Sequence, residues 1–429
     1  MNILSTFNFG SLIPIAILLL ISVIIPIILS IFGLKFIPVL VVEIICGVII
    51  GNIPFVYELF VAEGTLHFNN LIEGIYTIGM AVLLFLSGLD IDYSVLKPSH
   101  KNNCRTLPTF KISWILIGLV ILVSFGLSFT YFNDFVNSNL ETRITGVALL
   151  TIIFSSSFAS IIIPLIHDDH LAKTTIGKII STYGSIAEFI SIVALSILMI
   201  VLHVAHDAKP WLLILVIAIL VLVYIIRKYF FNEKIKNMFG GIVHLDVRHV
   251  LLVMLVLVII TQFAGAEFIL GAFLAGAIIK ATGIKKEVEE KFMSIGYGIF
   301  APMFYILVGV KVGLAIPFDE FFTLHNILLV LKVFSMLIIA KLPFLILAKW
   351  FKLSTAIESA FIVTTTIIVG LTCEHFGVFS EELMCAIIIA STMTCVIPPI
   401  VLFLNKKFGY SKDKHQDKIV NPDEVGCEH

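Results

Sequence analysis

The chain has 429 residues, of which 59% are hydrophobic and only 13% are charged, and its formal net charge is −1. So few charged side chains cannot cover a water-facing surface, which excludes a soluble globular domain. The sequence also lacks a nucleophile–base arrangement, a phosphate-binding glycine loop and a catalytic metal motif. We therefore expect neither an enzyme nor a resident cofactor.

Apolar runs of roughly 17 to 25 residues recur along the chain, and each is long enough to cross a hydrocarbon core of about 30 Å as a helix. The runs do not alternate as barrel strands do, so the sequence predicts an all-α integral membrane protein. The predicted spans, about thirteen, are 12–31, 37–53, 70–88, 111–131, 144–166, 177–202, 210–227, 249–264, 267–281, 294–313, 324–348, 355–376 and 383–404.

The basic residues predict the orientation of these spans. If the N-terminus faces outward, all but five of the 28 Lys and Arg residues fall on cytoplasmic connections, adjoining helix ends or the C-terminal segment. The five exceptions are Arg143, Lys209, Lys311, Lys332 and Lys341. We expect a single transmembrane domain over 1–404 and a short cytoplasmic polar tail over 405–429. The basic loops are explained as topology signals, so no nucleic-acid partner is expected, and the membrane lipids are the expected surroundings.

The second predicted span carries a carboxylate at Glu43, inside an otherwise apolar run. Its simpler interpretation is polarity for helix packing or for a dimer contact. The alternative is a place on an ion path, which makes Glu43 a secondary candidate.

The fifth predicted span is interrupted by the run Ser155-Ser156-Ser157 and then by Pro164. This pattern is typical of a broken membrane helix, whose unwound carbonyls and serine hydroxyls offer hard oxygen ligands to an alkali cation. The alternative is that the serines only hydrogen-bond back to their own helix.

The sixth predicted span places Glu188 near the middle of the bilayer. A carboxylate there is costly unless it is protonated or paired with a cation, so a proton and a cation become alternative occupants of one site. The competing interpretation is a permanently protonated side chain that bonds a neighbouring helix.

The eleventh predicted span holds Lys341, too far from the helix end to be an obvious interfacial anchor. An ammonium there can compete with a cation, pair with a carboxylate or neutralise helix dipoles. A tether to the interface through its long stem is the alternative.

The twelfth predicted span contains Thr364, Thr365 and Thr366, seven spans after the serine run. An odd offset reverses direction in the membrane, so spans four to six and eleven to thirteen are predicted to form an inverted repeat with two broken helices that cross. Packing of β-branched threonines is the alternative explanation.

Several segments together resemble the monovalent cation–proton antiporter superfamily, in the branch of bacterial sodium–proton exchangers and potassium-efflux antiporters. They are 38–51, 84–92, 271–276 and 303–310, together with the Glu188 region and Lys341. The resemblance implies that Glu188 is the shared cation and proton site and that Lys341 is the basic residue near it. Ala187 stands where the family usually has a polar or acidic residue, which favours electroneutral exchange. The threonine run also departs from the more polar crossover of the potassium-efflux relatives.

The resemblance further implies core helices over about 111–202 and 324–404 that move, elevator-fashion, against a dimerisation scaffold. The expected protein is a homodimeric antiporter of the inner or plasma membrane that exchanges Na⁺, K⁺ or Li⁺ for protons by alternating access. A proton-uncoupled cation channel and a non-transporting membrane sensor of the same fold are the alternatives.

Overall fold

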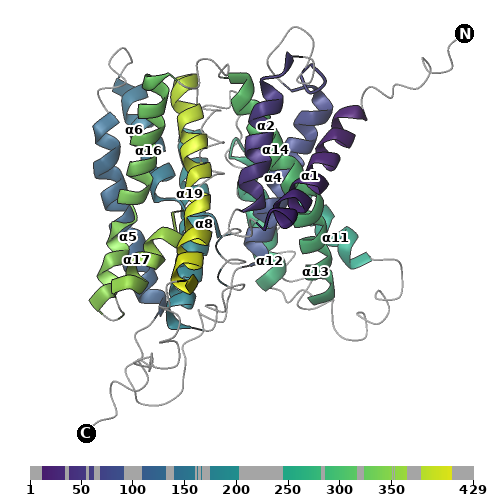
Figure 1. Ribbon diagram of the computed structural model, residues 1–429. Coiled ribbons are helices and arrows are strands. Elements are labelled where there is room, and N and C mark those ends of the chain that lie inside the picture. Colours follow the sequence, from purple (N-terminus) through teal and green to yellow (C-terminus); the bar gives the residue numbers. More distant parts are fainter. Residues whose placement is uncertain are drawn as a thin grey trace, which may run out of the picture.

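The protein is a bundle of helices in the computed structural model (Figure 1). The structure describes residues 12–33, 38–54, 58–61, 68–90, 109–131, 140–159, 162, 166, 174–201, 245–281, 286–315, 323–349, 351, 353–364 and 378–407. The helices in this part are α1 (Ile13–Ile31), α2 (Val39–Gly51), α4 (Asn70–Leu89), α5 (Thr109–Ser128), η4 (Phe129–Tyr131), α6 (Leu140–Ser155), α8 (Thr175–Val201), α11 (Leu245–Phe263), α12 (Phe268–Ala281), α13 (Lys286–Ile295), η6 (Gly296–Phe300), α14 (Ala301–Ala315), α16 (Leu324–Ile339), η7 (Leu342–Lys349), α17 (Leu353–Ile362) and α19 (Glu381–Lys407).

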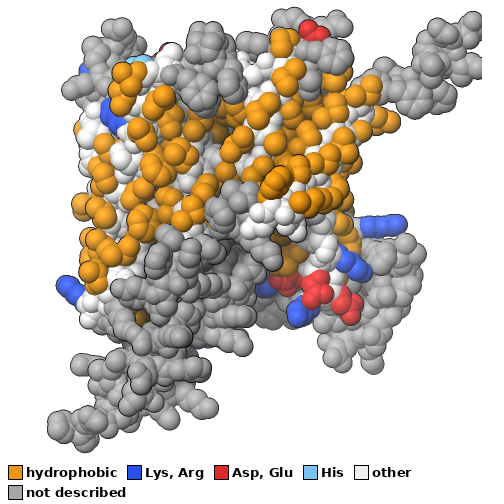
Figure 2. Space-filling model, viewed as in Figure 1, with side chains coloured by type: hydrophobic (Ala, Val, Ile, Leu, Met, Phe, Trp, Pro, Cys, Tyr) orange, Lys and Arg blue, Asp and Glu red, His pale blue; other side chains and the backbone are white. Residues whose placement is uncertain are grey.

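Seven of the described helical segments are long and apolar enough to cross a membrane. They are Ile13–Ile31, Asn70–Leu89, Thr109–Ser128, Thr175–Val201, Lys286–Leu314, Leu324–Lys349 and Glu382–Val401, and shorter apolar helices lie among them. Figure 2 shows hydrophobic side chains over most of the described surface on the visible face, with most of the charged side chains drawn there near one end. This distribution suits a lipid environment and agrees with the predicted all-α membrane protein.

Each predicted span except 210–227 overlaps a described helix, and 210–227 lies outside the described residues. The tenth span was predicted to begin at residue 294 but begins at Lys286. Here α13 continues through the π-helical turn η6 into α14. The reason is that α13 is amphipathic and polar, with its Lys280–Glu289 ion pair to α12, so hydropathy alone does not detect it.

The helices pack as two groups that lie side by side (Figure 1). The first group contains α5, α6, α8, α16, η7, α17 and α19, and the second contains α1, α2, α4, α11, α12, α13 and α14. Among the described residues, helix packing within each group is much more extensive than packing between the groups, which is made mainly by α8 with α12 and by α19 with α2 and α14. The boundary between the groups passes beside Glu188 on α8.

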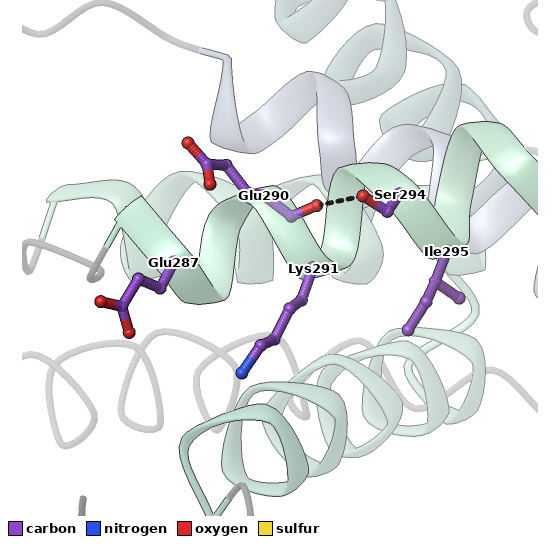
Figure 3. Close-up of a pocket in the computed structure, with 5 residues that line it drawn as sticks. All are labelled: Glu287, Glu290, Lys291, Ser294 and Ile295. Carbon is purple, nitrogen blue, oxygen red and sulfur yellow. Dashed lines mark hydrogen bonds between the residues drawn. The ribbon is translucent and has the colours of Figure 1, made fainter.

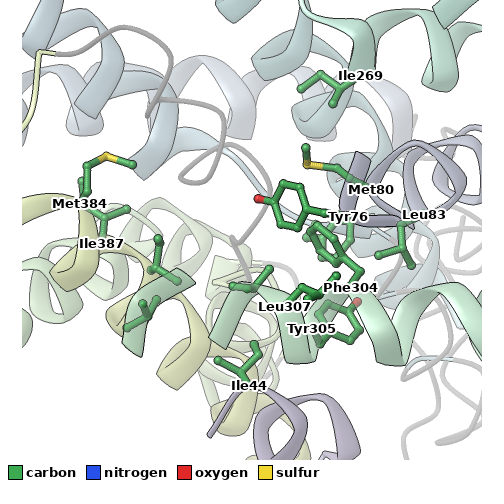
Figure 4. Close-up of a cluster of buried hydrophobic side chains, with 14 of the residues drawn as sticks. Ile44, Tyr76, Met80, Leu83, Ile269, Phe304, Tyr305, Leu307, Met384 and Ile387 are labelled. Carbon is green, nitrogen blue, oxygen red and sulfur yellow. The ribbon is translucent and has the colours of Figure 1, made fainter. Parts of the chain in front are cut away.

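The second group has a dense apolar centre, drawn in Figure 4. Tyr76 of α4 and Phe304 of α14 are in ring contact with their centroids 5.3 Å apart, and Ile44 of α2 belongs to the same cluster. Met384 and Ile387 extend the cluster onto α19. The cluster also includes side chains of α6, α8 and α16, so one packed apolar interior joins the second group to the first.

Glycines let α2 and α14 approach closely. A Cβ added to Gly47 would lie 2.0 Å from the carbonyl oxygen of Ile306, and one added to Gly309 would lie 2.0 Å from that of Ile44. These separations are far below van der Waals contact, so the two backbones touch because neither helix has a side chain at these positions.

We expect Gly47→Ala to force α2 and α14 apart and to lower the free energy of unfolding by about 1–3 kcal/mol, as overpacking does elsewhere. The measurement is thermal unfolding of the purified protein in detergent. Gly118→Ala on α5 is the matched control, because nothing lies within 4 Å of its added Cβ. Equal unfolding temperatures for the two variants would contradict the close approach of the two helices.

Candidate functional site

The serine run interrupts its helix. The helix α6 ends at Ser155, residues 156–158 are not helical, and helical geometry resumes at Ala159. The Ser155 and Ser156 hydroxyls donate to the carbonyls of Ile152 and Ile153 at 3.2 and 2.8 Å. Serine hydroxyls that bond the preceding turn compete with the regular helix pattern, which accounts for the end of α6 at this point.

Lys341 donates hydrogen bonds to the backbone carbonyls at the C-terminal end of α6. Its Nζ donates to the carbonyl oxygens of Ser155 and Ser156 at 2.9 and 2.6 Å, and the side chain is fully buried. The ring of Tyr183 lies under the ammonium, with its centroid 5.8 Å from Nζ. A cation at the carbonyl end of a helix satisfies acceptors that lack intrahelical partners and opposes the negative end of the dipole.

The segment around Lys341 is itself interrupted, which the prediction of a continuous span over 324–348 did not anticipate. The helix α16 ends at Ile339, and the 3₁₀ helix η7 begins at Leu342. Pro343 explains the change, because its ring clashes with the carbonyl four residues earlier and it has no N–H to donate. The break leaves Lys341 at the junction, directed at the end of α6 rather than along a regular helix face.

The end of another helix meets this break. The helix α17 ends at Ile362, and Val363 and Thr364 follow as a turn. The Ser157 hydroxyl donates to the Val363 carbonyl at 2.7 Å, which joins the two non-helical points directly. Thr364 is fully buried, and its hydroxyl donates to the Phe361 carbonyl at 2.7 Å. Thr365 and Thr366 lie outside the described residues.

Glu188 lies in the middle of α8 and is 3% exposed. Its Oε2 accepts two hydrogen bonds, one from the Ser87 hydroxyl at 2.5 Å and one from the backbone N–H of Ala159 at 3.0 Å. Its Oε1 is buried and has no hydrogen-bond partner within the described residues. One oxygen of the carboxylate is therefore held at the break after α6, and the other remains available to bind a proton or a cation.

The three predicted serine ligands do not bond Glu188 in this structure. The hydroxyls of Ser155, Ser156 and Ser157 all donate to backbone carbonyls, and Lys341 occupies the carbonyls of the first two. Within the described residues, the serine run forms the non-helical break after α6. The backbone N–H of Ala159, just beyond the run, makes the contact with Glu188.

Ser87 belongs to the site, although sequence reasoning gave it no role. It is buried near the end of α4, 101 residues before Glu188, and only the tertiary fold brings the two together. The helix α4 begins at a defined point, because the Asn69 side chain accepts from the Ile72 N–H at 3.0 Å. Its glycine Gly88 packs against the backbone of α12, where an added Cβ would lie 2.3 Å from the Phe273 carbonyl oxygen.

Glu43, the secondary candidate, is 2% exposed on α2. It does not bond Glu188 or the break after α6 within the described part of the chain. Tyr305 of α14 lies within electrostatic range of both carboxylates. Of the two acidic candidates, Glu188 is therefore the one that bonds the break after α6 in the described part of the chain.

Asp90 follows the last residue of α4 and lies near the Lys280–Glu289 ion pair, whose Nζ–Oε1 distance is 2.6 Å. Burial raises the pKa of the Asp90 carboxyl to about 7, against the opposing effect of Lys280 and with a further increase from Glu289. Asp90 lies one helical turn beyond Ser87, and it is also within electrostatic range of Glu188. A titrating group therefore lies at the end of the helix that contacts the site.

The raised pKa predicts a pH-dependent stability. An unfolded aspartate ionises near pH 4, so between about pH 4 and 7 the folded chain keeps a proton that the unfolded chain releases. The contribution of Asp90 is then largest at low pH and is lost as the pH rises to about 7. Asparagine does not ionise, so we expect the free energy of unfolding of Asp90→Asn not to fall over this pH range. At pH 8 it should exceed that of wild type by about 1–3 kcal/mol. Unfolding temperatures in detergent from pH 5 to 8 test it, with the exposed Glu287→Gln as control; parallel curves for wild type and Asp90→Asn would contradict it.

A shallow pocket beside α13 is separate from this site. It is lined by Glu287, Glu290, Lys291, Ser294 and Ile295, and the Ser294 hydroxyl donates to the Glu290 carbonyl at 2.8 Å (Figure 3). None of the residues predicted for the site lines it, so it plays no part in the chemistry around Glu188.

Comparisons with known proteins agree with the resemblance drawn from the sequence. A family model described as the transmembrane sodium/hydrogen exchanger matches residues 17–404. The chain is 28% identical over 394 residues to the putative Na⁺/H⁺ antiporter YjbQ of Bacillus subtilis, an alignment that covers 90% of this chain and 61% of that protein. It is 23% identical to the probable Na⁺/H⁺ antiporter 3 of Methanocaldococcus jannaschii, over 85% of this chain and 90% of that protein. A short match of 39% identity over 51 residues, 12% of this chain and 13% of that protein, is to the Na⁺/H⁺-K⁺ antiporter GerN of Bacillus cereus.

Proposed function

Because the chain belongs to the sodium/hydrogen exchanger family, we propose that it exchanges a monovalent cation for protons across a cell membrane, with Glu188 as the shared binding site. The observation that carries this proposal is that the two oxygens of the Glu188 carboxylate have different surroundings. Oε2 is fixed by Ser87 and Ala159, whereas Oε1 is buried without a partner in the described residues. Na⁺ is the first candidate, following the names of the relatives, with K⁺ and Li⁺ as alternatives.

The chemistry follows from burial. A carboxylate held away from water is stable when a proton or a cation neutralises it, so each ion displaces the other. Ala187 carries no second carboxylate beside Glu188. We therefore propose electroneutral exchange, in which one cation replaces one proton.

Lys341 supports this assignment through its position. Its ammonium neutralises the carbonyl end of α6 and makes no ion pair with Glu188 within the described residues. These hydrogen bonds therefore stabilise the end of α6, and Lys341 leaves the Glu188 carboxylate to the transported ions. The Ser155 and Ser156 carbonyls can join a cation site only if Lys341 releases them.

Alternating access is proposed to arise from motion of the first helix group against the second. Among the described residues, packing between the groups is less extensive than packing within them, and α6 and α17 both end inside the first group, where Ser157 bonds Val363; these features support this motion. The complete proposal includes about thirteen spans with an inverted repeat, an outward N-terminus and cytoplasmic C-terminus, and a homodimer in the inner or plasma membrane.

The test is proton movement in proteoliposomes that contain the purified protein. A lumenal pH dye is followed while Na⁺, K⁺ or Li⁺ is added in turn. The Na⁺ and Li⁺ additions are repeated with a potassium ionophore and equal K⁺ on both sides, which clamps the membrane potential. We expect cation-specific alkalinisation or acidification that persists under the clamp, because the proposed exchange carries no net charge. Cation flux that ignores the pH gradient would indicate a channel, and folded protein with no response to any cation would contradict transport.

A further inference from the structure

We infer that Ser87 is a positioning residue for the ion site, which orients the Glu188 carboxylate from the opposite helix group and favours its cation-bound form over its protonated form. The inference deepens the proposed function and rests on antiport at Glu188. It concerns a residue to which the sequence pattern gave no role.

The Ser87–Glu188 hydrogen bond crosses the boundary between the two helix groups. Ser87 is on α4 of the second group, and Glu188 is on α8 of the first. A second contact crosses close by, where the Phe189 ring of α8 stacks on the Phe273 ring of α12 with centroids 5.6 Å apart. The bond therefore forms only while the two groups have this arrangement.

The second group holds Ser87 rigidly. Gly88, the next residue, contacts the backbone of α12, and an added Cβ at Gly276 of α12 would lie 2.1 Å from the Phe85 carbonyl oxygen. Because α4 and α12 touch backbone to backbone on both sides of Ser87, the hydroxyl has little freedom to follow Glu188. A change of access state must then break this bond rather than carry Ser87 along.

The direction of the bond decides its effect. The Ser87 hydroxyl donates at 2.5 Å to Oε2, which already accepts the Ala159 N–H at 3.0 Å. A donated hydrogen bond is stronger to an ionised carboxylate than to a neutral acid, so these two donors favour the charged form. Loss of the hydroxyl should therefore help protons compete against cations.

The other charged or titratable groups near Glu188 do not replace this donor. Asp90 just beyond α4 and Tyr305 on α14 lie within electrostatic range. Lys341 is engaged by the Ser155 and Ser156 carbonyls of the same break. Among the described side chains, Ser87 is the one that donates to the carboxylate.

The experiment compares wild type with Ser87→Ala and Ser87→Cys in proteoliposomes, with apparent KM and maximal rate measured from pH 6.5 to 9. We expect Ser87→Ala to raise the apparent KM for the cation about tenfold at fixed pH and to move the pH profile about one unit to higher pH. The maximal rate at saturating cation should be retained. Cysteine keeps the size with a weaker donor, so Ser87→Cys should fall between the two.

The matched control is Ser113→Ala, which removes a buried hydroxyl that bonds the Ile179 carbonyl inside the first group at 3.3 Å. Its KM and pH profile should match those of wild type. A fall in maximal rate for Ser87→Ala with unchanged KM and pH profile would overturn the inference and leave antiport standing. No cation-coupled proton movement in wild type would overturn both proposals, and if Ser87→Ala does not fold, Ser87→Cys decides the outcome by the same two readouts.

Discussion

Glu188→Gln is expected to abolish cation-driven proton movement, with a loss of about 100-fold or more, because the amide neither titrates nor carries the charge that attracts a cation. The variant should still fold. Glutamine has nearly the size of glutamate, and its carbonyl oxygen can accept from Ser87 and Ala159 as Oε2 does. The measurements are the lumenal pH response to each cation and the thermal unfolding profile of the same preparation.

Glu43→Gln is the matched control, since it neutralises the other deeply buried candidate, on α2. We expect it to retain exchange, because Glu43 does not bond the interrupted helices in the described part of the molecule. Wild-type exchange by Glu188→Gln would refute the site assignment. If only Glu43→Gln lost exchange, the ion site would have to be assigned to Glu43 on α2.

Lys341→Leu is expected to lower the free energy of unfolding by about 3–5 kcal/mol and to impair exchange. The substitution leaves two buried carbonyls, of Ser155 and Ser156, without donors and removes the charge that opposes the end of the α6 dipole. Lys341→Gln should recover part of the stability, because its amide can donate to a carbonyl, but not the positive charge.

The measurements are unfolding temperature in detergent and the pH profile of exchange for both variants. Lys349→Leu is the control, because Lys349 is exposed at the end of η7. If Lys341→Leu and Lys349→Leu unfold at the same temperature and exchange alike, Lys341 only anchors its segment and does not support the break.

Much of the fold was predictable because membrane helices must satisfy their own backbone and present apolar side chains to lipid. The segments 12–31 and 70–88 agree closely with α1 (Ile13–Ile31) and α4 (Asn70–Leu89) for this reason. The polar helix α13 was missed, since its amphipathic pattern does not resemble a spanning run. The change from α16 to η7 had a signal in Pro343, beside the lysine that drew attention to the segment.

The candidate site was only partly predictable. Glu188 and Lys341 were predicted as site residues because ionisable residues deep in apolar runs are costly and therefore conspicuous. Their partners were not, because hydrogen-bond partners depend on which helices meet. Lys341 could have paired with a carboxylate or with a helix end, and the structure directs it to the carbonyls of Ser155 and Ser156.

The sequence by itself determined a helical membrane protein with an acid and a base inside apolar runs, because hydropathy and the cost of buried charge act locally along the chain. The tertiary structure decided that the break after α6 and the end of α17 touch through Ser157 and Val363, and that Ser87 reaches Glu188 from the other helix group. Such contacts depend on the packing of glycine-lined helix faces between segments far apart in sequence, which no local pattern specifies.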